Sequence, residues 1–297
     1  MDVMEAESNW VVGDEIAIAS TSFKFDEAEK KKITSIGANA EGKLKVGLDS
    51  ALKYEHLGER KMYGSREVKM QAEVGLLSRN VRILGDESSS VQTEYGGHIL
   101  VKGNYVEARI KDVEMYHMGQ AYQVGRHPVS FVEAEHLGAS YVAQTSIWDG
   151  FNRAIALSAS NCAKIERNVA FRVMGHNFFL RDGVERDNTF EGNLAVATRA
   201  SHSLLNTDQT PAAFWVPSPR NHFKSNHAAG AEMYGFWLDP PPHPTGQSAS
   251  EAICPPGEQL GSFDGNVAHS TGRYGLRLFS EHTPRKFPCK PISVEPT

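Results

Sequence analysis

The chain has 297 residues, of which 40% are hydrophobic and 23% are charged, a balance typical of a folded protein with a sizeable core. Its formal net charge of −5 provides no basic surface for nucleic acid, so we expect no partner of that class. No stretch approaches the roughly 18 consecutive apolar residues of a membrane helix. We therefore expect no membrane insertion by this segment, and the acidic start at residues 1–10 does not predict a signal peptide.

The first third of the chain reads as short strands. Residues 11–19, 43–48 and 68–84 alternate between apolar and polar side chains or are rich in β-branched ones, with glycines and charged turns between them. Residues 26–36 have some helical periodicity but are also compatible with a strand and a loop. We expect residues 1–94 to form an N-terminal β cap that covers the exposed strand edges of the structure that follows.

An internal repeat dominates the rest of the chain. Four segments have a large apolar residue, an asparagine three positions later and an alanine two beyond that. Their asparagines are Asn168, Asn193, Asn226 and Asn266. Asparagine tolerates the left-handed conformation of a bend, and stacked asparagines can form a hydrogen-bonded ladder. The first interval, 25 residues, fits three short strands and three bends, so we predict an all-β fold, a right-handed single-stranded parallel β-helix.

A second block supports the same repeat. Ten positions after three of these asparagines come pairs of apolar residues spaced by two, which face the same way on a strand. The pairs are Phe178 with Leu180, Phe236 with Leu238, and Leu276 with Leu278. Asn193 fits once residues 201–211 are treated as an inserted loop.

Two weaker repeats extend the pattern toward the N-terminus. They begin at Val142 and Ile110 and give six coils within residues 95–283, followed by an irregular Pro-rich tail at 284–297. Cys254 and Cys289 flank Pro-rich loops, where one disulfide would pin a terminus, whereas Cys162 lies in a strand-like stretch and is expected to be a small buried side chain.

Between the two inward residues of each block lies one that points outward. In successive coils these outward residues are Ser130, Ala156, Phe179, Trp215, Trp237 and Arg277. Three adjacent aromatics on an outer face predict a stacking platform for sugar rings, with Arg153 as a further ligand contact. The alternative is that residues 239–258 or the N-terminal strands cover this row and make it a second core.

Charged residues near the row are the candidates for catalysis. Asp182 and Glu185 have the composition of an acid–base pair for glycosidic cleavage, and Arg126 lies nearby in the pattern. The same two carboxylates are also ordinary turn residues, because Asp182 precedes a glycine. No histidine or cysteine spacing matches a metal site, so neither a metal nor another cofactor is expected.

Several motifs resemble one known family. Residues 126–131 (Arg-His-Pro-Val-Ser-Phe), 175–183 (Gly-His-Asn-Phe-Phe-Leu-Arg-Asp-Gly) and 210–216 (Thr-Pro-Ala-Ala-Phe-Trp-Val) resemble the β-helix region of the fibrocystin-L and cell-surface hyaluronidase family, which includes the transmembrane and cell-migration-inducing types. Residues 10–19 look like the end of the glycine-rich domain that precedes it, so the likeness runs from about residue 10 to 290. The resemblance implies a fragment or shortened relative of large extracellular or cell-surface proteins.

One departure from the family bears on function. Ser130 and Val132 stand where relatives typically carry two histidines, so general acid–base chemistry at that strand is lost. The resemblance then implies a non-catalytic module that binds glycans, hyaluronan among them, or partner proteins at the cell surface. The alternatives are a hyaluronan-depolymerising hydrolase and a structural spacer.

Overall fold

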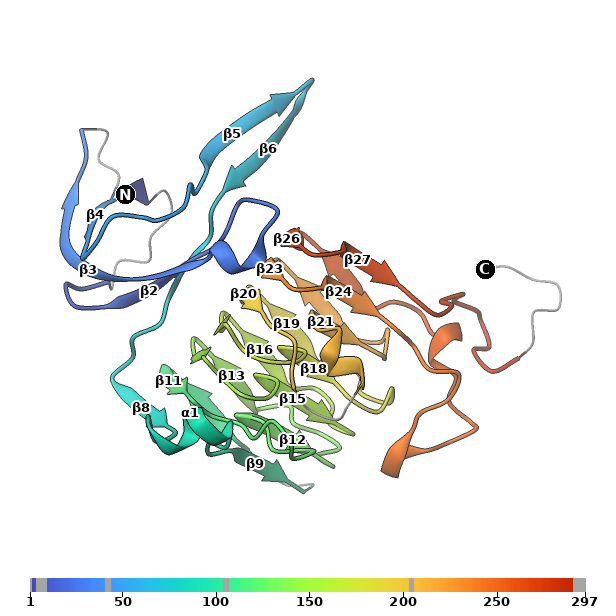
Figure 1. The fold of residues 1–297 in the computed structure, drawn as a ribbon. Coiled ribbons are helices and arrows are strands. Elements are labelled where there is room, and N and C mark those ends of the chain that lie inside the picture. Colours follow the sequence, from blue (N-terminus) through green and yellow to red (C-terminus); the bar gives the residue numbers. More distant parts are fainter. Residues whose placement is uncertain (1, 4–9, 41–43, 104–106, 203–205, 291–297) are drawn as a thin grey trace.

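The computed structural model describes residues 2–3, 10–40, 44–103, 107–202 and 206–290. Strands dominate these ranges, and three parallel sheets run along the length of one stack (Figure 1). The chain is therefore a parallel β-helix, as the repeat predicts.

Each sheet takes one strand from every coil. The first sheet contains β10 (Arg109–Lys111), β13 (Tyr141–Ala143), β16 (Lys164–Glu166), β19 (Thr189–Glu191), β22 (His222–Lys224) and β25 (Ser262–Asp264). The second contains β8 (Val81–Leu84), β11 (Val113–Tyr116), β14 (Ser146–Trp148), β17 (Val169–Phe171), β20 (Leu194–Thr198), β23 (His227–Ala231) and β26 (Val267–Thr271). The third contains β9 (Ile99–Lys102), β12 (Val129–Val132), β15 (Ile155–Ser158), β18 (Phe178–Leu180), β21 (Ala212–Val216), β24 (Tyr234–Leu238) and β27 (Tyr274–Leu278).

The coils follow the predicted spacing. Six coils have a strand in all three sheets, from β10 to β27, and β8 and β9 precede them. The expected domain boundary between residues 94 and 95 remains a prediction. Strand β8 lies before this boundary and already pairs with β11 in the second sheet. The predicted insertion at 201–211 is a loop between β20 and β21 that contains the 3₁₀ turn η2 (Asn206–Gln209).

The asparagine ladder is present. The amide nitrogen Nδ2 of Asn168 donates to Oδ1 of Asn193 at 2.9 Å, and the same bond joins Asn193 to Asn226 and Asn226 to Asn266 at 3.0 Å. Thr145 begins the ladder, because its backbone N–H donates to Oδ1 of Asn168 at 3.0 Å. The four amides therefore lie on a common line along the stack.

The left-handed bend lies one residue earlier than expected. Positive φ angles belong to the residues directly before the ladder asparagines: Arg167 (51°), Gly192 (65°), Ser225 (50°) and Gly265 (63°). The preceding residue makes the turn, and the asparagine side chain is then free to point along the stack. Its hydrogen bonds offset the cost of a left-handed bend at a residue such as Arg167.

The interior is filled by the inward residues of the three sheets. Phe178, Phe214 and Phe236 stack with ring centroids 4.7 and 4.6 Å apart, and all are buried. Such like-on-like stacking follows from the parallel register, which places equivalent residues of successive coils beside one another.

The N-terminal strands form a separate antiparallel sheet. Its order is β1 (Asp2–Val3), β4 (Leu44–Leu48), β3 (Glu29–Ala38), β2 (Glu15–Ile18) and β7 (Val74–Leu76), and the 3₁₀ turn η1 (Phe25–Glu27) precedes β3. A hairpin of β5 (Gly58–Tyr63) and β6 (Arg66–Gln71) projects away from it (Figure 1). Segment 26–36 is thus mostly strand rather than helix.

We expected this sheet to cover the strand edges of the first coil, but it lies elsewhere. It packs beside the stack, where Ala17 and Ala19 join Trp148 and Phe171 of the second parallel sheet in one buried apolar cluster. The alternation along residues 16–19 explains the arrangement, because Ala17 and Ala19 face the stack whereas Ile16 and Ile18 face the sheet's own core.

The remaining elements are short. They are α1 (Ser89–Thr93) between β8 and β9, and η3 (Gly246–Ser248) and η4 (Pro255–Gly257) in the loop after β24. A disulfide joins Cys254 to Cys289 and ties the C-terminal segment to that loop, whereas Cys162 is half-buried.

Candidate functional site

The predicted outward row exists in the predicted register. Phe179 pairs with Trp215, Trp215 with Trp237, and Trp237 with Arg277, on the outer side of the third sheet. The row is nevertheless covered, since Trp215 is 8% and Trp237 6% exposed. Together with Tyr234 they form a second apolar cluster outside the main core. The structure thus favours the alternative in which the row is a second core.

Two arginines and a histidine of the protein itself contact the aromatic rings of the row. The Arg153 guanidinium lies 3.6 Å from the centre of the Phe179 ring, and that of Arg277 lies 4.1 Å from the Trp237 ring. The His176 ring is 4.5 Å from that of Trp215. A sugar ring would have to displace these groups to reach the aromatic faces.

Arg153 is held there by Asp208 of the inserted loop. Arg153 donates from Nε to Oδ1 of Asp208 at 3.0 Å and from Nη2 to Oδ2 at 2.8 Å, and both side chains are buried. Burial alone would raise the pKa of Asp208, but the Arg153 charge holds it below its ordinary value. Such a paired, buried carboxylate stays ionised and is a poor proton donor.

Two histidines beside the row are uncharged. Burial lowers the pKa of His176 to about 3, and its Nδ1 accepts the backbone N–H of Ala212 at 3.0 Å. Burial also takes the pKa of His127 well below its ordinary value. Nδ1 of His127 lies 2.9 Å from the hydroxyl of Ser130, so an imidazole does reach this strand from the neighbouring turn.

The predicted catalytic carboxylates hold a turn together. Glu185 accepts the backbone N–H groups of Asp182 at 2.8 Å and Gly183 at 2.9 Å, and Asp182 accepts the Ser158 hydroxyl at 2.8 Å. Both carboxylates are buried, and burial raises the pKa of Glu185. Arg126, the third candidate, is exposed beside His98, so the structure does not join these residues into one site.

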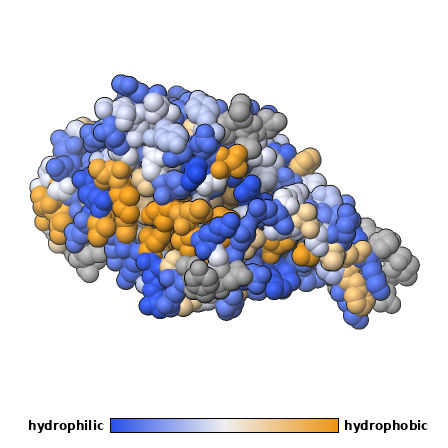
Figure 2. Space-filling model, turned by 90° about the horizontal axis from the view of Figure 1, so that it is seen from below, coloured by the Kyte–Doolittle hydropathy of each residue, from blue (hydrophilic) through white to orange (hydrophobic). Residues whose placement is uncertain are grey.

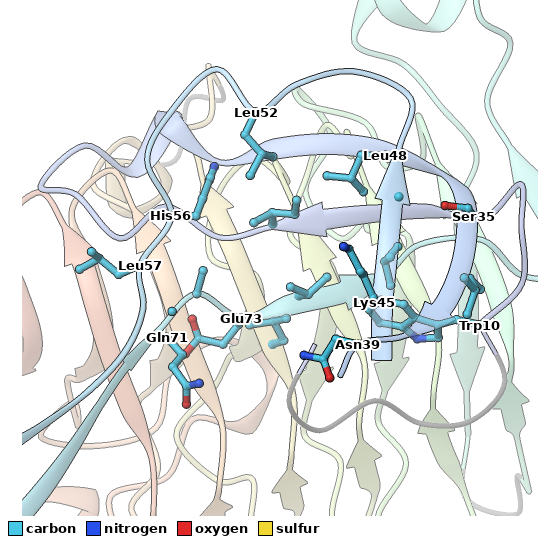
Figure 3. A pocket seen from close by; sticks show the side chains of 18 of the residues that line it. Trp10, Ser35, Asn39, Lys45, Leu48, Leu52, His56, Leu57, Gln71 and Glu73 are labelled. Carbon is cyan, nitrogen blue, oxygen red and sulfur yellow. The ribbon is translucent and has the colours of Figure 1, made fainter. Parts of the chain in front are cut away.

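A large hollow lies elsewhere, between the N-terminal sheet and the stack (Figure 3). This groove has a volume of about 1720 Å³, against 360 Å³ for a second pocket near the C-terminal segment. Trp10, Lys45 and Asn39 lie toward one end of the groove, and His56 and Gln71 toward the other. The lining of the groove thus combines apolar and polar side chains.

A hydrogen-bonded cluster links the wall of the groove to the stack. Glu73 precedes β7, and its two oxygens lie 2.6 Å from Nδ1 of His227 and 2.7 Å from Nε2 of His269. Although burial raises the pKa of Glu73, these hydrogen bonds lower it to about 2. No local sequence pattern could have found this cluster, because 154 and 196 residues separate Glu73 from the two histidines.

Within the described ranges, none of the helices is long and apolar enough to cross a membrane. The same residues contain no group of three or more histidine, cysteine or carboxylate side chains arranged to hold a metal ion.

Comparison with known proteins agrees with the fold and with the family resemblance. Fibrocystin-L of Mus musculus is 35% identical over 313 residues, which cover 93% of this chain and 7% of that protein. A G8 domain-containing protein of Dictyostelium discoideum is 33% identical over 284 residues, with 90% of this chain and 18% of that protein covered. Cell surface hyaluronidase CEMIP2 of Homo sapiens is 31% identical over 320 residues, or 93% and 23%.

The chain therefore spans less than a quarter of the length of each of these three relatives. The model of the CEMIP β-helix matches residues 94–276, more than half of the chain. By this match, and by the coils described above, the chain belongs to the CEMIP β-helix family.

Proposed function

We propose that the chain is a non-catalytic binding module of a cell-surface or extracellular protein, and that it holds a glycan in the groove beside the stack. The observation that carries the proposal is the groove itself, a hollow of about 1720 Å³ whose lining includes the aromatic ring of Trp10, the cation of Lys45 and the amides of Asn39 and Gln71. Aromatic faces and amide groups are suited to sugar rings and hydroxyls, and Lys45 is suited to a carboxylate.

The positions of the predicted catalytic residues support a binding role. Asp182 and Glu185 are buried; Glu185 accepts a backbone N–H of its own turn, and Asp182 accepts the Ser158 hydroxyl. His127 and His176 are buried and neutral. A glycosidase needs two carboxyl groups that flank the scissile bond from open positions. Two of the similar proteins bear the name cell surface hyaluronidase, so hyaluronan is the first glycan to test.

Titration with hyaluronan oligosaccharides, followed by tryptophan fluorescence, tests the binding. Trp10 lines the groove and is half-buried, so we expect its emission to change on binding and the change to vanish in Trp10→Phe. Lys45→Glu should weaken binding of an anionic glycan about tenfold, because it replaces an attractive charge with a repulsive one. Lys164→Glu, an exposed lysine of β16 that does not line the groove, is the matched control.

Three results would contradict the proposal. They are no fluorescence change with hyaluronan or other anionic glycans, equal losses for Lys45→Glu and Lys164→Glu, and a change that survives in Trp10→Phe.

A second candidate function is hyaluronan depolymerisation, which rests on the 31% identity with a protein named a hyaluronidase. Incubation with long hyaluronan and sizing of the product decides between the two. We expect an unchanged size distribution, whereas shortening that Glu185→Gln abolishes would establish the hydrolase instead.

A further inference from the structure

A second pocket lies where the turns before β19, β22 and β25 meet residues 285–288 of the C-terminal segment. Its volume of about 360 Å³ is close to the lower limit of the range typical of small-ligand sites. It shares no lining residue with the groove beside the N-terminal sheet. It also lies toward the opposite end of the stack from the first coil, where hydrophobic side chains gather over β8 and β9 (Figure 2). The pocket is therefore a site of its own.

Charged side chains dominate the lining of this pocket. Three are cations, Arg220, Arg285 and Lys286, and two are carboxylates, Asp187 and Glu258. All five belong to the described part of the chain, yet no two of them form a salt bridge of 4.0 Å or less. Cations that surround a hollow without a carboxylate partner are suited to an anion that supplies the missing acceptors.

Arg285 is held in place and still has donors to offer. Its Nη1 donates to the backbone carbonyl of Lys290 at 2.8 Å, and its Nη2 donates to the hydroxyl of Thr283 at 3.1 Å. The Nε of Arg285 is buried and has no hydrogen-bond partner among the described residues. A buried donor without an acceptor is costly, and an anionic oxygen in the pocket would remove that cost.

The Arg220 guanidinium is unpaired within the described ranges. Arg220 is half-buried, and the contact that it makes to Asp187 uses its backbone carbonyl, which accepts the Asp187 N–H at 2.8 Å. Burial raises the pKa of Glu258, although the charges of Arg220 and Arg186 act to lower it. Such a balance is expected where no cation touches the carboxylate directly. The positive charge of Arg220 is thus available to a ligand.

The wall that carries Arg285 is anchored to the preceding loop. The disulfide between Cys254 and Cys289 joins the two segments covalently. The backbone N–H of Arg285 also donates to the carbonyl of Gly257 at 2.8 Å. A wall fixed in this way loses little conformational entropy when a ligand binds, which favours affinity.

We propose that this pocket binds a small oxyanion group, the sulfate, phosphate or carboxylate of a ligand, through Arg220 and Arg285. The planar fork of a guanidinium matches two oxygens of such a group, and the exposed Lys286 adds a third positive charge. The site goes beyond the proposed function, because it requires neither the groove nor a glycan within it.

Backbone chemical shifts test the proposal directly. The isotope-labelled chain is titrated at constant ionic strength with sodium sulfate, inorganic phosphate or sodium acetate, with sodium chloride as the reference. We expect saturable shifts at the amides of Arg220, Gly261 and Arg285, and the anion that saturates at the lowest concentration identifies the preferred group. The absence of saturable shifts at these amides with all three anions overturns the proposal.

Substitution of the two arginines removes the expected contacts. Arg220→Gln and Arg285→Gln should each weaken binding of the preferred anion about tenfold, because each removes one charged donor. Arg273→Gln is the matched control, since Arg273 is an exposed arginine that does not line the pocket. Equal losses in Arg273→Gln and Arg220→Gln would show that the anion responds only to the overall charge, against the proposal.

A variant that gains affinity separates binding from folding. Glu258→Gln removes a negative charge from the lining, so it should strengthen anion binding about threefold. Misfolding cannot produce such a gain, and weaker binding in Glu258→Gln would contradict the site. Lys45→Glu, which alters the groove, should leave anion binding here unchanged, so this test stands whether or not the groove holds a glycan.

Discussion

The outer faces of the second and third sheets both carry aromatic side chains, yet they are buried in different ways. On the second sheet, Trp148 and Phe171 lie under the small residues Ala17 and Ala19 of the N-terminal sheet. On the third, the aromatics lie under Arg153 and other polar groups, some of them from the inserted loop. An outward aromatic residue therefore indicates a ligand platform only after every covering segment has been considered.

The largest expected effect comes from breaking the charged cover of the third sheet. Arg153→Met should lower the free energy of unfolding by about 4 kcal/mol, because it leaves Asp208 buried without its partner. Denaturant titration measures the loss. The double variant Arg153→Met/Asp208→Leu removes both charges and should lose less. An Arg153→Met variant as stable as wild type would show that the pair is exposed to water in solution.

On the second sheet the cover is apolar, so we expect the free energy of unfolding to fall when side-chain volume is removed there. Phe171→Ala leaves a cavity beneath the N-terminal sheet, and we expect a loss of about 3 kcal/mol. Phe171→Leu is the milder control. Hydrogen exchange of β2 should accelerate in Phe171→Ala, whereas unchanged protection there would mean that the sheet does not depend on this contact.

The pH dependence of stability tests the burial of His176 beside the third sheet. The pKa of His176 is lowered to about 3 in the folded chain, so below about 6.5 the unfolded chain binds a proton that the folded chain does not. Stability should therefore fall as the pH drops from 6.5 toward 3, by about 3 kcal/mol at pH 4.5. Denaturation at several pH values measures this, and His176→Gln should flatten the profile. An equally steep profile in the variant would assign the effect to another group.

The smallest expected effect concerns the hydrogen bonds that Glu73 makes beside the groove. Glu73→Gln should cost about 1 kcal/mol near neutral pH, because a charged acceptor of two hydrogen bonds becomes neutral. The folded pKa of Glu73 is about 2, below its ordinary 4.5, so its contribution is present above 4.5 and is lost as the pH falls toward 2. Thermal melts across that window should show a shallower loss in Glu73→Gln than in wild type. Parallel profiles would contradict this role.

Periodic features could be predicted from the sequence. The asparagine ladder, the inward apolar pairs, the inserted loop and the outward row all follow from one repeat, since stacked coils place equivalent residues together. A second ladder, in which Asn188 donates to Asn221 at 2.9 Å, was missed. Its signal was present, because each of these asparagines lies two residues before a core phenylalanine, Phe190 or Phe223.

Contacts between segments that the repeat does not relate could not be predicted. Asp208 lies 55 residues from Arg153 and belongs to the insertion, so no periodicity joins them. The N-terminal sheet was expected over the first coil, and only the fit of its alanines against the large aromatics of the second sheet decides its place. The groove follows from that placement and therefore could not be predicted from the sequence either.

Solvent access to Trp215 and Trp237 tests the central claim, that the aromatic row is a covered second core and that ligands bind in the groove. A Trp10→Phe/Trp148→Phe variant retains only these two tryptophans. Their emission should be blue-shifted, weakly quenched by acrylamide and unchanged by hyaluronan oligosaccharides. Strong quenching that hyaluronan relieves would show instead that the row is an open sugar platform.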